Sequence, residues 1–264
     1  MLPFGVTDLE FSIVTFISAL VGILLIIGAS SFIKPRFIAA FAFGVYLWYF
    51  TDTLGDANYL DVNQGAVFSV ELVSLVTLFA IGVIVFFALD GRIFTMGEET
   101  AKYGMMVALL AALALGLHGF GEGADFGYTA AQTPSNTLLD AFGGLGPSAS
   151  WVLHKMFEPT IAAACYVAFA GVGAKKPVDK LVDSLTLATV FVIPAIVGSI
   201  AGYYLTFDHT YVFALGLGVS VYAVARVARS MFSGAAEASS GFSLKMAIAV
   251  VIGFVCIFIS ALLH

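Results

Sequence analysis

The chain has 264 residues, of which 61% are hydrophobic and only 11% are charged, and its formal net charge is −6. A soluble globular domain usually carries about 25% charged residues, so this composition excludes a soluble enzyme or binding module and predicts a polytopic membrane protein. No polar stretch is long enough to fold alone, so we expect one transmembrane domain over 1–264, with no nucleic-acid partner.

Apolar segments follow one another along the chain, each close to the 20 residues that a bilayer-crossing helix needs. Their runs are continuous, as in LVSLVTLFAIGVIVFFAL, whereas the strands of a membrane barrel alternate in polarity. The opening MLPFGVTDLE lacks the basic start of a cleaved signal peptide, so the first segment is predicted as a retained helix. We therefore predict an all-α fold of eight transmembrane helices, over 11–33, 36–54, 66–89, 103–128, 150–173, 184–205, 211–228 and 243–263.

The segment 129–149 is rich in Gly, Pro, Ser and Asn, and we expect it to be the longest irregular connection. The basic residues test this division into helices. Ten of the eleven fall in or beside alternate connections, which lie on one side of the membrane: Lys34, Arg36, Arg92, Lys102, Lys175, Lys176, Lys180, Arg226, Arg229 and Lys245. Cytoplasmic connections carry an excess of Lys and Arg. We therefore expect both termini to lie outside the cytoplasm, in a protein of the cell membrane.

Two apolar segments contain ionisable residues, in HGFGEGAD (118–125) and HKMFE (154–158). Residues four apart share a face of a helix, so His118 and Glu122 form one pair and His154 and Glu158 form another, while Asp125 lies close to the first pair. A charge at the bilayer centre costs about 2.5–3.5 kcal/mol even on the lenient insertion scale. These groups are therefore predicted to face each other or a water-filled path.

Imidazole nitrogen and carboxylate oxygen together suit Zn²⁺, Fe²⁺ or Mn²⁺, so the two pairs predict an intramembrane cation site. Lys155 is an internal cation beside it, and Pro159 cannot donate to the carbonyl four residues earlier, which predicts a bend there. Three other interpretations stay open. The same groups suit a proton relay, Lys155 and Glu158 suit a structural salt bridge, and a lone intramembrane histidine suits an interhelical hydrogen bond.

With these residues identified, the chain resembles the ZIP family of divalent-metal transporters. HGFGEG is similar to the family's fourth-helix motifs HNxPEG and HNxxDG, and HKMFE is similar to its fifth-helix motif HxxxE. GVYLWYFTDTLGDA is similar to the end of its second helix, with Asp52 in place of a histidine and Asp56 in place of a glutamate. The resemblance implies eight helices with both termini outside, three-plus-two-plus-three inverted repeats, and alternating access.

The sequence also departs from that family. Members that bind two metals take further ligands from three places that hold Gly119, Lys155 and Ile193 here. The resemblance therefore implies a single metal, with the Lys155 ammonium as a substitute for the second. Pro159 stands where the family has glycine, and DGRIFTMGEETAK lacks the histidines of the family's long cytoplasmic loop.

We expect transport of a divalent cation toward the cytoplasm, with Zn²⁺ first and Fe²⁺, Mn²⁺, Co²⁺ and Cd²⁺ open. No enzymatic activity and no resident cofactor are expected; the partners are the lipid bilayer and the cation, and a homodimer stays open. Alternatives are a proton-coupled carrier or a non-transporting subunit that has lost metal binding, and an intramembrane Zn²⁺ enzyme that activates water. The expected ligands are His118, Glu122, His154 and Glu158 with Asp125 as an additional ligand, and the expected outer gate is Asp52 and Asp56.

Overall fold

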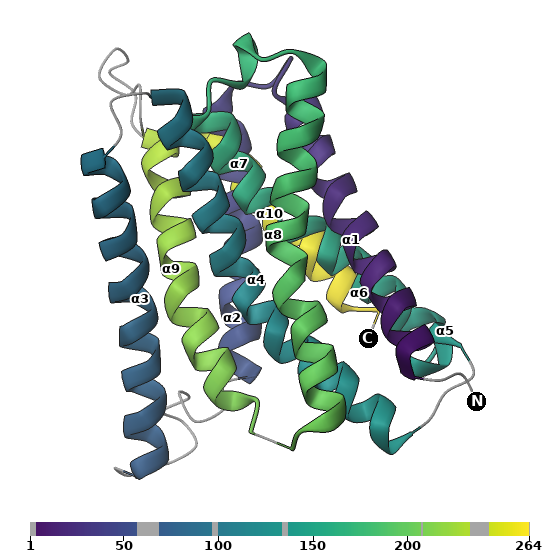
Figure 1. The fold of residues 1–264 in the computed structure, drawn as a ribbon. Helices are drawn as coiled ribbons and strands as arrows, with labels where there is room; N and C mark the ends of the chain where they lie inside the picture. Colours follow the sequence, from purple (N-terminus) through teal and green to yellow (C-terminus); the bar gives the residue numbers. More distant parts are fainter. Residues whose placement is uncertain are drawn as a thin grey trace.

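The computed structural model describes residues 4–56, 69–96, 100–133, 137–206, 208–232 and 243–263. All regular structure in these ranges is helical, as predicted (Figure 1). The elements are α1 (Phe4–Ala29), α2 (Pro35–Asp56), α3 (Val70–Met96), α4 (Thr100–Gln132), α5 (Leu138–Ala141), α6 (Leu145–Phe157), α7 (Thr160–Phe169), the short 3₁₀ helix η3 (Val172–Ala174), α8 (Pro177–Tyr204), α9 (Thr210–Phe232) and α10 (Leu244–Ala261).

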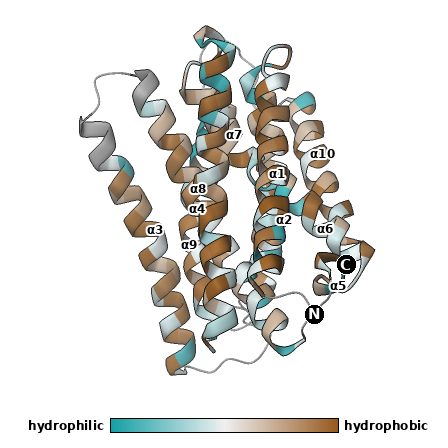
Figure 2. Ribbon diagram, turned by 45° about the vertical axis from the view of Figure 1, so that its right-hand side comes forward, coloured by the Kyte–Doolittle hydropathy of each residue, from teal (hydrophilic) through white to brown (hydrophobic). Residues whose placement is uncertain are grey.

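Seven of the described helices are long and apolar enough to cross a membrane: α1, α2, α3, α4, α8, α9 and α10. Hydrophobic residues predominate along these helices, as the colours of Figure 2 show. In the most apolar stretches of α3 and α10, only 17% and 22% of the residues are buried inside the protein. These two helices therefore lie at the periphery of the bundle. These observations confirm an all-α integral membrane protein.

The segment predicted as one helix over 150–173 is divided into α6 and α7. The amide of Glu158 makes the last hydrogen bond of α6, to the His154 carbonyl at 3.0 Å, and Pro159 then has no N–H to continue the ladder. The helix is therefore interrupted at Pro159, and the prediction of one continuous helix over 150–173 was wrong. Neither α6, with 13 residues, nor α7, with 10, approaches the roughly 20 residues of a spanning helix.

The prediction of a long irregular connection over 129–149 was also wrong. α4 continues to Gln132, and α5 begins after Thr137, whose hydroxyl accepts a hydrogen bond from the Asp140 amide at 3.1 Å. Gly143 and Gly144, with φ of +83° and +117°, make the turn into α6. Most of the described residues in 129–149 are therefore helical.

The most extensive helix contact in the structure joins α4 to α8. Gly123 and Gly127 of α4 lie so close to α8 that an added Cβ would come within 2.0 and 1.9 Å of carbonyl oxygens there. Gly198 and Gly202 of α8 face carbonyls of α4 in the same way. Small residues let membrane helices approach closely, so this packing fixes α4, which carries the first half of the candidate site, against α8.

The first turns of α2, α4, α8 and α10 lie at one end of the bundle, which we call the basic end, and the start of α1 and the end of α10 lie toward the other end, which we call the acidic end (Figure 1). This arrangement agrees with the prediction that alternate connections lie on the same side of the membrane. Arg226 lies near the end of α9, beside the connection that follows, as predicted. It pairs with Asp90 of α3, which also accepts a hydrogen bond from Tyr222 at 2.9 Å. Its charge is therefore neutralised by a buried acid.

Candidate cation site

The candidate site lies between α4 and the break that separates α6 from α7. His118 and Glu122 lie one turn apart on α4. At 1.5 Å per residue, His118 is about 27 Å from the start of that helix and Glu122 is about 15 Å from its end. Glu158 lies at the break itself, and Lys155 lies one turn before it on α6. The irregular backbone after Glu158 thus occurs inside the bundle, where a spanning protein tolerates it.

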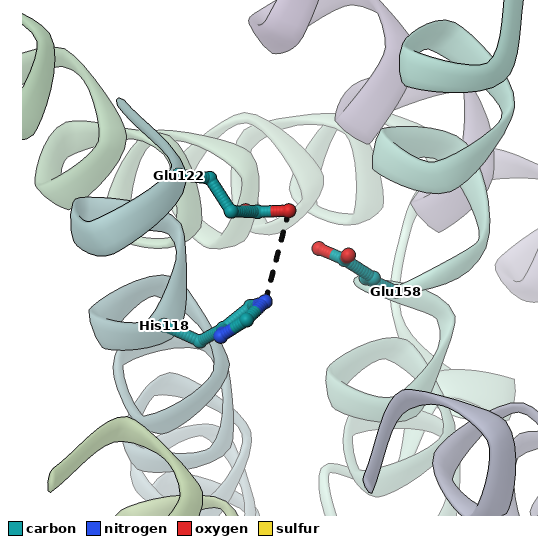
Figure 3. Close-up of side chains that lie close together, drawn as sticks. All are labelled: His118, Glu122 and Glu158. Carbon is teal, nitrogen blue, oxygen red and sulfur yellow. Dashed lines mark ion pairs between the residues drawn. The ribbon is translucent and has the colours of Figure 1, made fainter. Parts of the chain in front are cut away.

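Three potential ligands meet at this point. One nitrogen of His118 and one carboxylate oxygen from each of Glu122 and Glu158 all lie within 4.8 Å of one another. Figure 3 shows the Glu158 carboxylate pointing across the gap toward the other two side chains. His118 Nε2 is 3.6 Å from Glu122 Oε1, which is longer than a hydrogen bond. The imidazole and the carboxylates therefore face a common point without being bonded to each other.

Lys155 joins the two carboxylates. Its Nζ donates to Glu158 Oε2 at 2.7 Å and also to Glu122 Oε2. The lysine and Glu158 side chains are only 1% and 2% exposed, and the ammonium lies 4.8 Å from the centre of the Trp151 ring. Glu122 thus presents Oε2 to the ammonium and Oε1 to His118, so it stands between a fixed positive charge and the imidazole.

Aromatic rings line the site around His118. The ring of Tyr49 on α2 lies 4.9 Å from the imidazole centre, and that of Phe213 on α9 lies 5.2 Å from it. Gly216 of α9 lets that helix approach, because an added Cβ would sit 3.0 Å from the His118 Cα. Sequence reasoning missed Tyr49 and Phe213, since an aromatic residue in an apolar helix has the same signal whether it faces lipid or a site.

His154, a predicted ligand, does not join this cluster. Its Nδ1 lies 3.4 Å from the Ser150 hydroxyl and 3.5 Å from that of Ser260 on α10, and its ring packs 4.8 Å from Trp48 of α2. The reason is rotation of α6. The pair Lys155 and Glu158 faces α4, which turns His154, one residue earlier, toward α2 and α10. Ser150 and Ser260 were not singled out from the sequence.

Asp125, the predicted additional ligand, also stands apart from the cluster. It pairs with His209, just before α9, and its side chain is 56% exposed. Of the predicted gate residues, Asp52 lies exposed on α2, and the side chain of Asp56 is outside the described residues. His209 was not predicted as a partner because it is remote in sequence from Asp125.

Exposure of the site is unequal along α4. Glu122 is 18% exposed, and Asp125, one turn nearer the acidic end, is 56% exposed. In the other direction, Leu115, Ala111 and the facing Leu187 of α8 are completely buried. The structure therefore closes the site toward the basic end, and its exposure increases toward the acidic end.

No protein-family model matches this sequence, and no curated protein matches it. The functional argument therefore rests on the site. One imidazole and two carboxylates are a donor set that Zn²⁺ and similar divalent ions accept. A set of three protein ligands leaves a coordination position for water, which favours exchange over permanent retention.

Proposed function

We propose that this protein transports a divalent cation across the membrane through the site formed by His118, Glu122 and Glu158. The observation that carries the proposal is the convergence of these three side chains, two of them almost fully buried, inside a bundle of apolar helices. Buried ionisable residues in a membrane bundle mark ion pathways far more often than lipid contacts.

The spacing of the ligands fits Zn²⁺ as the cargo. Two atoms bound to one tetrahedral zinc at about 2.1 Å lie about 3.4 Å apart, and His118 Nε2 and Glu122 Oε1 are 3.6 Å apart. Since all three ligand atoms lie within 4.8 Å of one another, a shift of roughly 1.4 Å by Glu158 completes the set. Fe²⁺, Mn²⁺, Co²⁺ and Cd²⁺ accept the same donors and are the competing cargoes.

Lys155 explains how a single ion is sufficient. Each carboxylate uses Oε2 for the ammonium, which leaves the other oxygen of each for a cation. The carboxylates then bridge a metal and an ammonium as they would bridge two metals. The sum of two carboxylates and one ammonium is one negative charge, so a divalent cation brings the site to one positive charge.

We also propose that α6 and α7 form one crossing together, which gives eight crossings and the three-plus-two-plus-three plan of the ZIP family. The contacts between helices support this plan, because most of the larger ones have a counterpart when α1 is exchanged with α8, α2 with α9, α3 with α10, and α4 with α6–α7. The contact of α2 with α10, for example, then corresponds to that of α9 with α3.

Glycines support the same correspondence. Gly44 and Gly253 each meet a carbonyl across the contact of α2 with α10, and Gly82 and Gly218 do so across the contact of α3 with α9. In this plan the basic end is cytoplasmic. The more exposed end of the site, at Glu122 and Asp125, then lies toward the outside of the cell. The structure then corresponds to an outward-facing state, from which transport proceeds toward the cytoplasm.

A carrier without a metal cargo is the second candidate, and the ion pairs of Lys155 favour it because they already neutralise most of the cluster. Zinc binding to purified protein distinguishes the two. We expect one Zn²⁺ per chain, lost in His118→Ala and Glu158→Gln and kept in the control His154→Ala. Absence of bound zinc in the wild type, or equal binding by all four proteins, would refute the proposed site.

A further inference from the structure

We propose that the basic end of α1, α2 and α10 holds an anionic phospholipid, with its acyl chain in an apolar groove and its phosphate among Lys34, Arg36 and Lys245. This site is separate from the cation site and does not depend on the proposed transport.

The groove is a cavity of about 360 Å³ lined by apolar residues. Its walls come from the end of α1 and the following turn, from α2 and from α10, and include Ala29, Ile33, Phe37, Phe41, Ala249 and Ile252. Ile33 is 39% exposed and Ile252 is 49% exposed, so the groove is open to the outside of the bundle. In a membrane-spanning protein, an apolar groove of this kind faces acyl chains.

Three cations stand at one level at the mouth of this groove. α2 and α10 run in parallel, with Gly44 against the Val250 carbonyl and Gly253 against the Phe41 carbonyl. Arg36 precedes Phe41 by five residues and Gly44 by eight, and Lys245 precedes Val250 and Gly253 by the same two intervals. The register therefore puts Arg36 and Lys245 at the same level along the two helices, and Lys34 lies in the turn that leads into α2.

These cations have no acidic partner within the described part of the chain, whereas Lys155, Lys175 and Arg226 each form an ion pair there. The Arg36 guanidinium lies 4.9 Å from the centre of the Phe37 ring, which is a groove residue, and its Nε is buried without a hydrogen-bond partner among the described residues. A phosphate oxygen at the groove mouth would accept that N–H.

Helix ends add to the positive potential. Both α2 and α10 begin at the groove mouth, and the start of a helix carries about half a positive charge. An anionic headgroup is therefore favoured by three side chains and two helix ends, while the apolar walls bind its chain. A second copy of this protein is a poorer occupant, because it would bring its own unpaired cations to the same surface.

Native mass spectrometry of delipidated protein with equimolar dioleoyl phosphatidylglycerol and phosphatidylcholine tests the proposal. We expect wild type to retain phosphatidylglycerol preferentially. Arg36→Gln/Lys245→Gln should reduce that preference by up to about 30-fold, since each cation near a membrane surface contributes about 1 kcal/mol. The matched control Lys176→Gln/Lys180→Gln, which removes two cations at the start of α8 that form no ion pair with another described residue, should retain it.

Ala249→Phe, which fills the groove, should lower retention of both lipids, and excess inorganic phosphate should not displace the lipid, because the chain contributes to binding. Equal preference in the two double variants would overturn the proposal. Complete displacement by inorganic phosphate would also overturn it and would indicate a simple anion site. A change of oligomeric state in Arg36→Gln/Lys245→Gln with unchanged lipid preference would assign the groove to a second copy instead.

Discussion

Replacing Lys155 by methionine should destabilise the protein strongly in the absence of divalent metal, and zinc should restore much of the loss. The substitution keeps most of the side-chain volume but removes the ammonium that lies between Glu122 and Glu158. Breaking a buried ion pair by removing one partner costs about 3–5 kcal/mol, because a charge is left buried without compensation. Here two carboxylates lose the same partner.

The size of the effect can be compared with a control within the chain. Lys175 pairs with Asp183 at 2.7 Å, but those side chains are 23% and 20% exposed, so Lys175→Met should cost about 1 kcal/mol. For a protein of this size about 1 kcal/mol lowers the melting temperature by roughly 2–4 °C. Lys155→Met should therefore melt about 6–20 °C below wild type in a chelator, and Lys175→Met only a few degrees below it.

Thermal melting of the purified variants, with EDTA or with Zn²⁺, measures this directly. Adding Glu122→Gln to Lys155→Met should recover part of the stability without metal, because it removes one of the two uncompensated charges. Zinc at a hundred times its dissociation constant should add about 2.7 kcal/mol to Lys155→Met. If Lys155→Met melts like Lys175→Met, or if zinc has no effect on it, the ammonium does not balance the site as we describe.

Three further changes test the fold around the site. Gly123→Ala should destabilise the bundle by about 2 kcal/mol or more in thermal melting, because its Cβ would lie 2.0 Å from a carbonyl of α8, while Gly119→Ala, whose nearest contact is 3.5 Å away, should be tolerated. Arg226→Gln should cost about 3 kcal/mol by leaving Asp90 buried and uncompensated, and adding Asp90→Asn should recover most of it. Pro159→Ala should join α6 to α7, detected as added helicity by circular dichroism, and should weaken zinc binding by displacing the end of α6; unchanged binding would show that the break does not position the site.

The sequence predicted the helical class and most spans, because a continuous apolar run of bilayer length satisfies its backbone hydrogen bonds in lipid by forming a helix. It also identified the four residues that meet, His118, Glu122, Lys155 and Glu158, since an ionisable group in such a run must find a partner. The predicted spans were less accurate at their ends and at the break after Glu158, where the two short helices α6 and α7 replace the single predicted helix.

The predictions for His154 and Asp125 depended on spacing along single helices, and that spacing does not define the rotation of one helix against its neighbours. The i, i+3 pair of Lys155 and Glu158 competes with the i, i+4 pair of His154 and Glu158, and the structure adopts the former. Asp125 finds His209, whose approach depends on how α9 packs against α4. Contacts between elements distant in sequence leave no periodic signal in one chain.

The central claim is vectorial movement of a divalent cation through His118, Glu122 and Glu158, and uptake of radioactive Zn²⁺ into proteoliposomes tests it most directly. Wild type and His154→Ala should take up zinc to a level that exceeds empty liposomes and saturates with concentration. His118→Ala/Glu158→Ala, compared at equal amounts of folded protein, should fall to the level of empty liposomes. Equal uptake by wild type and the double variant would contradict the account.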